Sequence, residues 1–417
     1  MLTKEENELL TRVGPGTPAG ELLRRYWHPI ALPQELTEEQ PTKFVRVLGE
    51  DLVLFRDKQG KVGLLAARCS HRGASLLYGR VEDRGIACAY HGWLYDVEGN
   101  CLECPTEPRE SRVHLTVKHK AYPVVNFIGL YWTYMGPKPA PLIPKYDVWA
   151  RKDGTRKIVV YPLLDANWFQ AMENSVDPAH LQILHQDTAL RARKPVSTTR
   201  GFIDDIEKTE FYEVPYGIMK KRSYKRGVVD EHPLIFPTIL RQGDATQIRV
   251  PVDDTHTLIF FVHFIPEESR NGEEEEPEVL YLPPFKDPPN ALHPFTRFRT
   301  DLVLAQDHMV WETPGPISDR TCERLSTSDR GIVMLRQIMV REIRKVQEGF
   351  DPIGVMRDPA HDGIIDTKLA ESLEEMKARG QPPGGEVTAL TEAEAPQAGE
   401  KASSASLRSI ASHLRSL

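Results

Sequence analysis

Two short pairs of cysteine and histidine constrain the fold of this chain more than any other feature of its sequence. Cys69 and His71 form the first pair, and Cys88 and His91 form the second, with sixteen residues between the pairs. Together they supply two thiolates and two imidazoles, which are strong ligands for transition metals. We therefore expect the chain to fold part of itself around a metal group.

Two kinds of metal group use such a ligand set. In a Rieske [2Fe–2S] cluster, two Cys hold one iron and two His hold the other, which raises the reduction potential to roughly −150 to +300 mV. A structural zinc site can also use two Cys and two His, but zinc fingers keep their cysteines together in one pair and their histidines in another. Here each pair is mixed, and Gly73, Gly92 and Trp93 complete a Rieske-like fingerprint. The sequence favours the Rieske cluster over zinc.

Composition argues against several other classes of protein. The 417-residue chain has a formal net charge of −7 and a pI near 6.1, whereas a nucleic-acid-binding protein would need a concentrated basic face. A dense basic cluster at residues 220–222 is expected to be a solvated strand or loop. The first thirteen residues are rich in charge and contain no apolar run, so we expect no signal peptide and no membrane partner. The cytoplasm is the expected location.

Three further cysteines are left over once the cluster is assigned, and two of them stand close together. Cys101 and Cys104 have the spacing of a redox or zinc pair, but no second pair and no βαβ pattern accompanies them. Disulfides are rare in a reducing compartment. We expect ordinary packing thiols.

The hydrophobic pattern divides the chain into four parts. Residues 1–40 have helical spacing and predict an N-terminal helical arm. Residues 41–140 contain short alternating strands and predict an antiparallel β domain whose end loops carry the Cys–His pairs. Residues 141–375 mix helices with long strands, such as the hairpin 247–264, and predict an α+β domain with an antiparallel sheet covered by helices. Residues 376–417 are rich in Glu, Ala, Ser, Gly and Pro and predict a flexible tail.

A second group of metal ligands follows in the third part. Asp177, His180 and His185 offer one carboxylate and two imidazoles, the ligand types of a mononuclear non-heme iron site. Asp177 is also a good helix N-cap, which is its more ordinary role. On a regular helix the two histidines would lie about 140° apart. A π-type bulge or a helix end near Ile183 would bring them together.

The two motifs in this order resemble those of the terminal oxygenase component of Rieske non-heme iron oxygenases. The second motif of the resemblance reads Asn174-x-x-Asp177-x-x-His180-x-x-x-x-His185. Residues 306–331 resemble the phthalate-dioxygenase-like branch. The resemblance covers about residues 27–362 and implies an N-terminal Rieske domain with a C-terminal helix-grip (START-like) catalytic domain.

This resemblance also implies cofactors and ligands. The cofactors are a Rieske-type [2Fe–2S] cluster and a mononuclear non-heme Fe(II) bound by His180 and His185. Family position points to Asp307 as the third iron ligand, with Glu312 and Asp319 as alternatives. An exposed acidic residue near a helix start is the more ordinary role for Asp307.

Electron supply follows from the same resemblance. A separate reductase, with or without a ferredoxin, is implied, because the chain has no dinucleotide-binding glycine fingerprint. The implied assembly is a homotrimer or stacked trimers, in which electrons pass between neighbouring subunits from His91 through Asp177 to His180. A carboxylate that accepts hydrogen bonds from two ligand imidazoles would fix both rings. Asn174 is expected to be a nearby pocket or outer-shell residue.

The implied reaction uses O2 to hydroxylate once or twice, or to O-dealkylate, a small aromatic and acidic substrate. Arg241 or Arg249 could hold a substrate carboxylate through two parallel hydrogen bonds, although a surface salt bridge is the more ordinary role. Two other classes remain open from the residues alone. One is a Rieske electron carrier with a ligand-binding domain and no oxygenase chemistry, and the other is a zinc-structured interaction protein.

Overall fold

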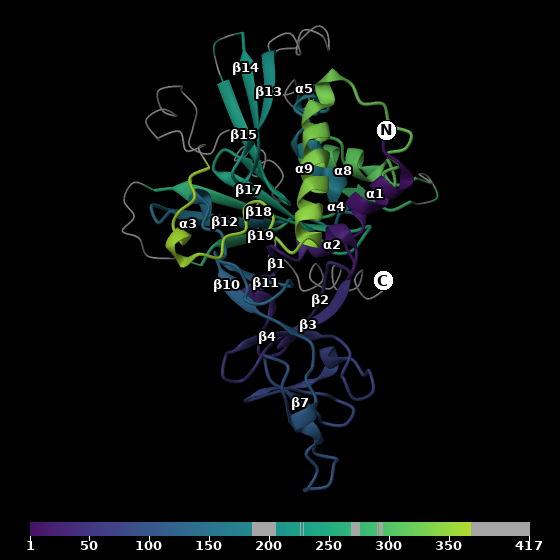
Figure 1. Ribbon diagram of the computed structural model, residues 1–417, viewed down its shortest axis with the longest axis vertical. Helices are drawn as coiled ribbons and strands as arrows, with labels where there is room; N and C mark the ends of the chain where they lie inside the picture. The colour runs from purple at the N-terminus through teal and green to yellow at the C-terminus, as the bar shows by residue number, and fades with distance from the viewer. Residues whose placement is uncertain are drawn as a thin grey trace. The chain divides into compact units, whose positions relative to one another are not determined.

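The computed structural model describes residues 1–185, 206–225, 227, 229–267, 276–289, 291 and 295–367 (Figure 1). Contacts divide the chain into two compact units, which we describe separately. Val13–Pro141 form the smaller unit, and Met1–Arg12 with Leu142–Leu417 form the larger one. The predicted tail, residues 376–417, lies outside the described residues. No helix in the described part of the chain is long and apolar enough to cross a membrane.

The smaller unit consists mainly of three small antiparallel sheets. Their strand orders are β1-β11-β10, β2-β3-β4-β9 and β5-β6-β7-β8. The strands are β1 (Trp27–Ala31), β2 (Thr42–Val47), β3 (Glu50–Arg56), β4 (Val62–Ala66), β5 (Arg80–Glu82), β6 (Gly85–Ala87), β7 (Leu94–Tyr95), β8 (Cys101–Glu103), β9 (Ala121–Tyr122), β10 (Val124–Phe127) and β11 (Leu130–Tyr134). The predicted antiparallel β domain is confirmed.

The β2–β3 hairpin illustrates why this part of the chain forms strands. Residues 52–55 are fully buried and continue the apolar run expected from the sequence. Leu48 and Gly49 form the turn with φ of 49° and 72°, and a two-residue turn with positive φ at both positions suits the right-handed twist of paired strands. Leu48 adopts this disfavoured conformation while its side chain is completely buried.

The first forty residues are helical only in part. α1 (Lys4–Thr11) begins at a capping box, in which Thr3 and Glu6 exchange side-chain and backbone hydrogen bonds. α2 (Pro18–Leu23) has Thr17 as its N-cap and proline at its first position. The helical character expected over residues 1–40 ends there, because Trp27–Ala31 form β1 and pair with β11. β1 is an edge strand, where a proline without an N–H is tolerated.

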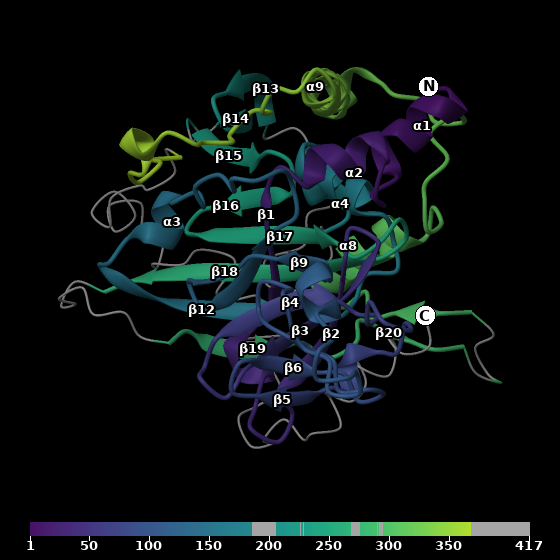
Figure 2. The same cartoon turned by 60° about the horizontal axis from the view of Figure 1, so that its bottom comes forward.

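The larger unit contains an eight-stranded sheet of order β13-β14-β15-β16-β17-β18-β12-β19. Its strands are β12 (Gly154–Val160), β13 (Ile206–Val214), β14 (Gly217–Tyr224), β15 (Val229–Ile235), β16 (Ile239–Gln242), β17 (Ala245–Pro251), β18 (Thr257–Pro266) and β19 (Glu278–Tyr281). All neighbours are antiparallel except β12 and β19, which are parallel. Figure 2 shows β16, β17, β18 and β12 side by side. A separate two-stranded sheet pairs β20 (Lys286–Asp287) with β21 (Arg297–Phe298).

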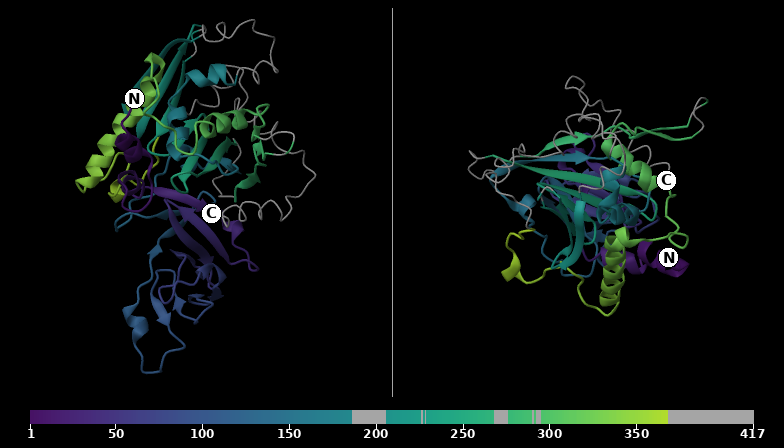
Figure 3. Two further views of the ribbon diagram at one scale, coloured as in Figure 1. Left: turned by 90° about the vertical axis from the view of Figure 1, so that its right-hand side faces the viewer. Right: turned by 90° about the horizontal axis from the view of Figure 1, so that it is seen from above.

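Helices of this unit pack on the sheet and on one another. In the described part of the chain they are α1, α3 (Asp147–Ala150), α4 (Trp168–Ser175), α5 (Ala179–Ile183), α8 (Val303–Glu312) and α9 (Arg330–Gln347). Ala171 of α4 and Ala305 and Trp311 of α8 share a buried cluster with Val159 and Phe261 of the sheet. The long helix α9 packs against α4 and β13 (Figure 3). The predicted α+β class, with an antiparallel sheet and covering helices, is confirmed.

Candidate metal centres

Two loops of the smaller unit carry the Cys–His pairs, and their backbones have the same geometry. The N–H of Gly73 donates to the carbonyl of Cys69, and the N–H of Gly92 donates to the carbonyl of Cys88, both at 2.9 Å. Each cysteine N–H in turn donates to the carbonyl of the residue after the glycine, which is Ala74 in the first loop and Trp93 in the second. Both hydrogen bonds are 2.9 Å long. The two glycines have φ of 73° and 72°, which side chains with a Cβ rarely adopt. The sequence therefore builds one tight turn twice.

These loops bring the four predicted cluster ligands together. The thiols of Cys69 and Cys88 are each 3% exposed, and the imidazole rings of His71 and His91 lie 4.5 Å apart between centroids. Nδ1 of His71 is buried and has no hydrogen-bond partner among the described residues. An unpaired buried nitrogen is costly unless something binds it, so this donor set fits a Rieske cluster.

Aromatic side chains enclose the four ligands. The ring of Trp93 stacks on that of His71 at 4.4 Å and 2°. The buried hydroxyl of Tyr95 lies 3.2 Å from Sγ of Cys69, and a hydrogen bond to a ligand sulfur is one means of setting a cluster's potential. Sequence reasoning missed the Tyr95 contact, although Tyr95 stands in the strand that directly follows the second loop.

In the larger unit, α5 carries the first candidate iron ligand and ends just before the second. His180 lies in α5, which ends at Ile183, and His185 follows the end of the helix. The ring centroids of His180 and His185 are 5.6 Å apart. The helix end expected near Ile183 is therefore present, although Leu184 keeps helical dihedrals, and the two rings lie close enough to reach one metal ion.

Asp307 approaches both histidines from α8. Its Oδ1 lies 3.2 Å from Nε2 of His185 and 3.9 Å from Nε2 of His180. One ligand atom from each of the three residues lies within 4.8 Å of the others. The Asp307 side chain is only 13% exposed, which departs from the ordinary role of a solvated acidic residue. Two histidines and one carboxylate are the ligand set of non-heme iron(II) oxygenases.

The environment favours the protonation state that a metal needs at His180 and Asp307. At His185, burial lowers the pKa, but the hydrogen bond and charge of Asp307 outweigh burial and raise it. Burial lowers the pKa of His180 to about 4, so its imidazole is neutral near pH 7. Burial alone would raise the pKa of Asp307, but the hydrogen bond and charge of His185 outweigh burial, and the pKa is lowered. A neutral imidazole and an ionised carboxylate are the forms that bind a cation. The three residues fit a mononuclear iron.

Outer partners orient both histidines. Nδ1 of His185 lies 2.8 Å from Oε1 of Gln306, and Nε2 of Gln306 donates to the carbonyl of Thr300 at 2.7 Å. Nδ1 of His180 contacts the backbone carbonyl of Asp177. Such contacts fix which ring nitrogen faces a metal. Sequence reasoning missed Gln306, although it directly precedes Asp307.

Asp177 contacts both the start of α5 and His180. Its Oδ1 accepts a hydrogen bond from the N–H of Ala179 at 2.9 Å, as a helix cap would. Its Oδ2 lies 3.8 Å from Nδ1 of His180. Asn174 lies near the end of α4, and its carbonyl accepts from the N–H of Asp177 at 3.0 Å. The structure thus places Asp177 beside His180, and Asn174 contacts Asp177 through its backbone carbonyl.

The two alternatives for the third iron ligand, Glu312 and Asp319, have other partners. Glu312 is paired with Lys286, which also pairs with Asp165 at 2.5 Å. Asp319 accepts hydrogen bonds from the N–H and the hydroxyl of Thr321 at 2.9 and 2.6 Å. Neither belongs to the group formed by His180 and His185.

Several basic residues expected at the surface are buried. Arg241 and Arg249 are 0% and 1% exposed; Arg241 bonds Asp147 and Arg249 bonds the carbonyl of Ala171. The surface role considered for both is wrong, because they lie on inner strands that helices cover. Lys220 is likewise buried, and burial lowers its pKa to about 7, so residues 220–222 are not the solvated cluster that was predicted.

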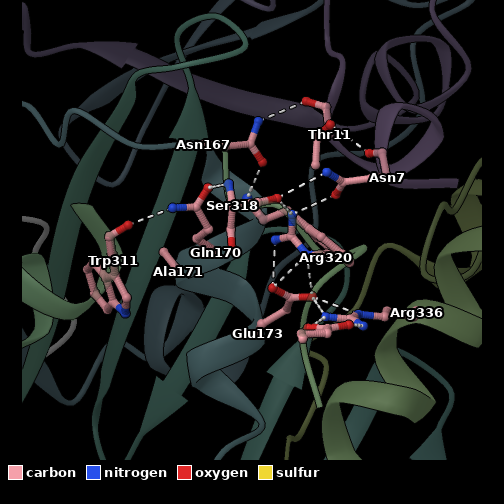
Figure 4. A network of polar contacts seen from close by, with 12 residues as sticks. Asn7, Thr11, Asn167, Gln170, Ala171, Glu173, Trp311, Ser318, Arg320 and Arg336 are labelled. Atoms are coloured by element: carbon pink, nitrogen blue, oxygen red, sulfur yellow. Dashed lines mark hydrogen bonds and ion pairs between the residues drawn. The ribbon is translucent and has the colours of Figure 1, made fainter. Parts of the chain in front are cut away.

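A buried ionic network anchors α4, the helix that leads to the iron ligands (Figure 4). Glu173 accepts from Nε and Nη2 of Arg320 at 2.9 and 2.6 Å and from Nε of Arg336 at 2.8 Å. Arg320 also reaches Asn7 of α1 at 3.0 Å. Gln170, one turn earlier, donates to the carbonyl of Trp311 at 2.6 Å. This network ties α4 to α1, α8 and α9.

Comparisons with known proteins agree with this arrangement. Residues 26–123 match the Rieske [2Fe-2S] domain, and residues 297–366 match the family described as LigXa C-terminal domain like. The 5,5'-dehydrodivanillate O-demethylase oxygenase subunit of Sphingobium sp. is 38% identical over 90% of this chain and 91% of its own length. This chain belongs to the Rieske oxygenases, in their phthalate-dioxygenase-like branch.

A further relative supports the assignment to the Rieske oxygenases, and a solved structure shares the fold. The phthalate 4,5-dioxygenase oxygenase subunit of Pseudomonas putida is 34% identical over 85% of this chain and 89% of its own length. The terminal oxygenase of carbazole 1,9a-dioxygenase from Nocardioides aromaticivorans shares the fold, with a TM-score of 0.55 at 19% identity over 82% of this chain and 98% of that one. The cofactors of this Rieske oxygenase are a [2Fe–2S] cluster and a mononuclear non-heme iron. A bare electron carrier is not favoured.

Proposed function

We propose that this Rieske oxygenase O-demethylates or hydroxylates an acidic aromatic substrate at an iron held by His180, His185 and Asp307. The approach of these three side chains, in a chain that also has a Rieske domain, carries the proposal. Cys69, His71, Cys88 and His91 hold the cluster. When bound, the cluster supplies single electrons and the iron activates dioxygen beside the substrate.

The chain's own residues prepare the iron site. Gln306 accepts from Nδ1 of His185 and leaves Nε2 directed toward Asp307. The carbonyl of Asp177 does the same for His180. Each contact selects one tautomer and holds one ring, which strengthens the imidazole as a ligand. Asn174 supports Asp177 from the end of α4.

His91 would hold the cluster and would be the ligand through which a bound cluster passes on single electrons. Asp177 bridges His91 of one subunit and His180 of its neighbour in a homotrimer or stacked trimers. The partial exposure of the Asp177 side chain, 26%, and its position beside Nδ1 of His180 support this role. A separate reductase, with or without a ferredoxin, supplies the electrons, and the enzyme works in the cytoplasm. Light scattering that finds a monomer under assay conditions would contradict the bridge.

The substrate class is drawn from the relatives. The Sphingobium relative is named as the O-demethylase of a dehydrodivanillate and the Pseudomonas relative as a phthalate dioxygenase, so both names specify aromatic acids. O-demethylation of a methoxylated aromatic acid consumes one O2, two electrons and two protons and yields a phenol, formaldehyde and water. Ring dihydroxylation, which the phthalate relative favours, is the second candidate.

Turnover on a panel of aromatic acids tests the proposal. The holoenzyme is supplied with a surrogate reductase and NADH and is assayed for formaldehyde with methoxylated acids and for diols with unmethoxylated ones. Formaldehyde formed in step with substrate loss, together with a phenol that keeps its unlabelled oxygen under ¹⁸O2, supports O-demethylation. A diol carrying two labelled atoms supports the second candidate. Reduction of the cluster without any substrate loss across the panel would overturn both.

A further inference from the structure

Cys101 and Cys104 form a close thiol pair in the smaller unit. Their Sγ atoms lie 3.5 Å apart. Cys101 is 5% exposed in β8, whereas Cys104 is partly exposed in the residues that follow. Two sulfurs at this distance need only a small side-chain movement to reach bonding distance.

The thiol pair adjoins both cluster loops. Cys101 pairs in register with Tyr95 of β7, and the hydroxyl of Tyr95 contacts the cluster ligand Cys69 at 3.2 Å. On the other side, Pro105 packs over Gly92, where an added Cβ would lie 2.8 Å from Cγ of the proline. The segment 101–105 therefore contacts the supports of both ligand pairs, although none of its residues is a ligand.

We propose that Cys101 and Cys104 are a modification site, which hydrogen peroxide converts reversibly into a disulfide. The more exposed Cys104 attacks peroxide, the O–O bond breaks, and a sulfenic acid and one water result. The thiol of Cys101 then attacks the Cys104 sulfur, the S–S bond forms, and the hydroxyl leaves with the thiol proton as a second water. The pair loses two electrons, and peroxide is the oxidant that accepts them.

Burial limits how quickly this reaction runs. It raises the pKa of Cys101 to about 12 and also raises that of Cys104, so little thiolate exists near pH 7. Thiolate is the reactive form. The pair is therefore suited to slow oxidation under sustained exposure to peroxide and not to rapid dithiol exchange. The disulfide would tie β8 to the residues that cover Gly92.

Peptide mapping of the holoenzyme tests the proposal. After incubation with hydrogen peroxide, the protein is quenched in acid, alkylated under denaturing conditions and cleaved after glutamate. This cleavage separates Gly99–Glu103, which contains Cys101, from Cys104–Glu110, because the bond between Glu107 and Pro108 resists cleavage. Cys88 falls in a third peptide, so a cluster ligand cannot mimic the result. We expect the two peptides to be joined in most molecules and to be released by dithiothreitol, with the cluster absorbance retained.

Two controls make the result decisive. Cys322 is exposed and has no thiol beside it among the described residues, so its oxidation shows that peroxide was effective. In the C104S variant, Cys101 should remain alkylatable after the same treatment. Separately alkylated peptides in the wild type while Cys322 is oxidised would overturn the proposal. A sulfinic acid at Cys104, or a bond from Cys101 to Cys88, would overturn it equally.

Discussion

The two metal centres of this chain reach their geometry by different routes. The cluster ligands come from two copies of one tight turn, each fixed by a glycine with positive φ and by hydrogen bonds within the turn. The iron ligands come from α5, the residues directly after it and α8, and His185 contacts Gln306, which is 121 positions away in the sequence. Local turn chemistry specifies the first centre, whereas packing of helices on a large sheet specifies the second.

This difference predicts which substitutions will affect only one metal centre. Changes in the larger unit should impair the iron site and leave the cluster spectrum intact, because the cluster loops hold their own shape. The predictions below run from the largest expected effect to the smallest.

Removing the third iron ligand should have the largest effect. In Asp307→Ala the two histidines lose the carboxylate that lies 3.2 Å from His185, and we expect turnover to fall by more than about 100-fold, the upper range for loss of an outer-shell partner. Substrate-dependent oxygen uptake measures this loss. Asp319→Ala, which removes a carboxylate bonded to Thr321 and Cys322 and outside the candidate iron site, is the matched control and should keep its activity. Similar activities in the two variants would contradict the ligand assignment.

Replacing Asp177 by Asn should reduce turnover by about 10- to 100-fold, the range for an outer-shell partner of a metal ligand. Asparagine caps helices as well as aspartate does, so the contact with the N–H of Ala179 survives and only the charge is lost. Iron content and the cluster spectrum should not change, and reoxidation of the reduced cluster by O2 and substrate should be slow. Full activity would show that Asp177 is a cap and not a bridge.

Replacing Gln306 by Leu should weaken iron binding by up to about tenfold, because Nδ1 of His185 loses its acceptor at 2.8 Å. Gln306→Glu keeps an acceptor oxygen and should retain more iron. Titration of the iron-free protein with Fe(II), followed by activity, compares the variants. Equal Fe(II) affinities in Gln306→Leu and the wild type would show that Gln306 does not contribute to iron binding.

Weakening the ionic network around Glu173 of α4 tests whether this network stabilises the larger unit without affecting the cluster. Glu173→Gln keeps the shape of the side chain but removes the charge that pairs with Arg320 and Arg336. We expect the larger unit to lose about 2 kcal/mol of stability, the scale of a hydrogen bond to a charged group. Thermal unfolding followed by near-ultraviolet circular dichroism measures the change. Loss of the cluster spectrum at temperatures where the wild type keeps it would contradict the independence of the two centres.

The smallest effect concerns pH and the smaller unit. Burial lowers the pKa of His28 to about 4 from an ordinary value of 6.5. Between pH 4 and pH 6.5, His28 is therefore protonated in the unfolded chain and neutral in the folded chain. The buried neutral His28 does not reduce the free energy of unfolding above pH 6.5, and it reduces this free energy progressively as the pH falls toward 4. Between pH 7 and 5.5 the loss should be about 1 kcal/mol. A His28→Gln variant should lack this part of the pH dependence, and an unchanged dependence would show that His28 does not cause it.

Sequence reasoning succeeded where structure is local. The cluster loops could be read directly, because each ligand pair stands beside the glycine that makes its turn. His180 and His185 were also visible in the sequence, and their ligand atoms lie within 4.8 Å of each other despite the five-residue spacing. The hairpin expected at residues 247–264 is present as β17 and β18.

Contacts between distant segments could not be read in the same way. The hydrogen bond from Gln306 to His185 exists only after α8 has packed on the sheet, and Asp307 could be named only through family resemblance. Arg249 and Lys220 look like surface residues in a linear pattern, but they lie on inner strands beneath α4. Trp27–Ala31 continued a helical pattern and instead joined β11, because pairing with a distant strand overrides weak local preference.

Iron content measured together with the cluster spectrum tests the central claim most directly. The purified wild type should contain about three irons per chain, two in the cluster and one in the mononuclear site. His180→Ala should contain about two and show an unchanged Rieske absorption and electron paramagnetic resonance spectrum. Three irons in the variant would mean that His180 is not a ligand. Loss of the Rieske spectrum in the variant would mean that the two centres are not built separately.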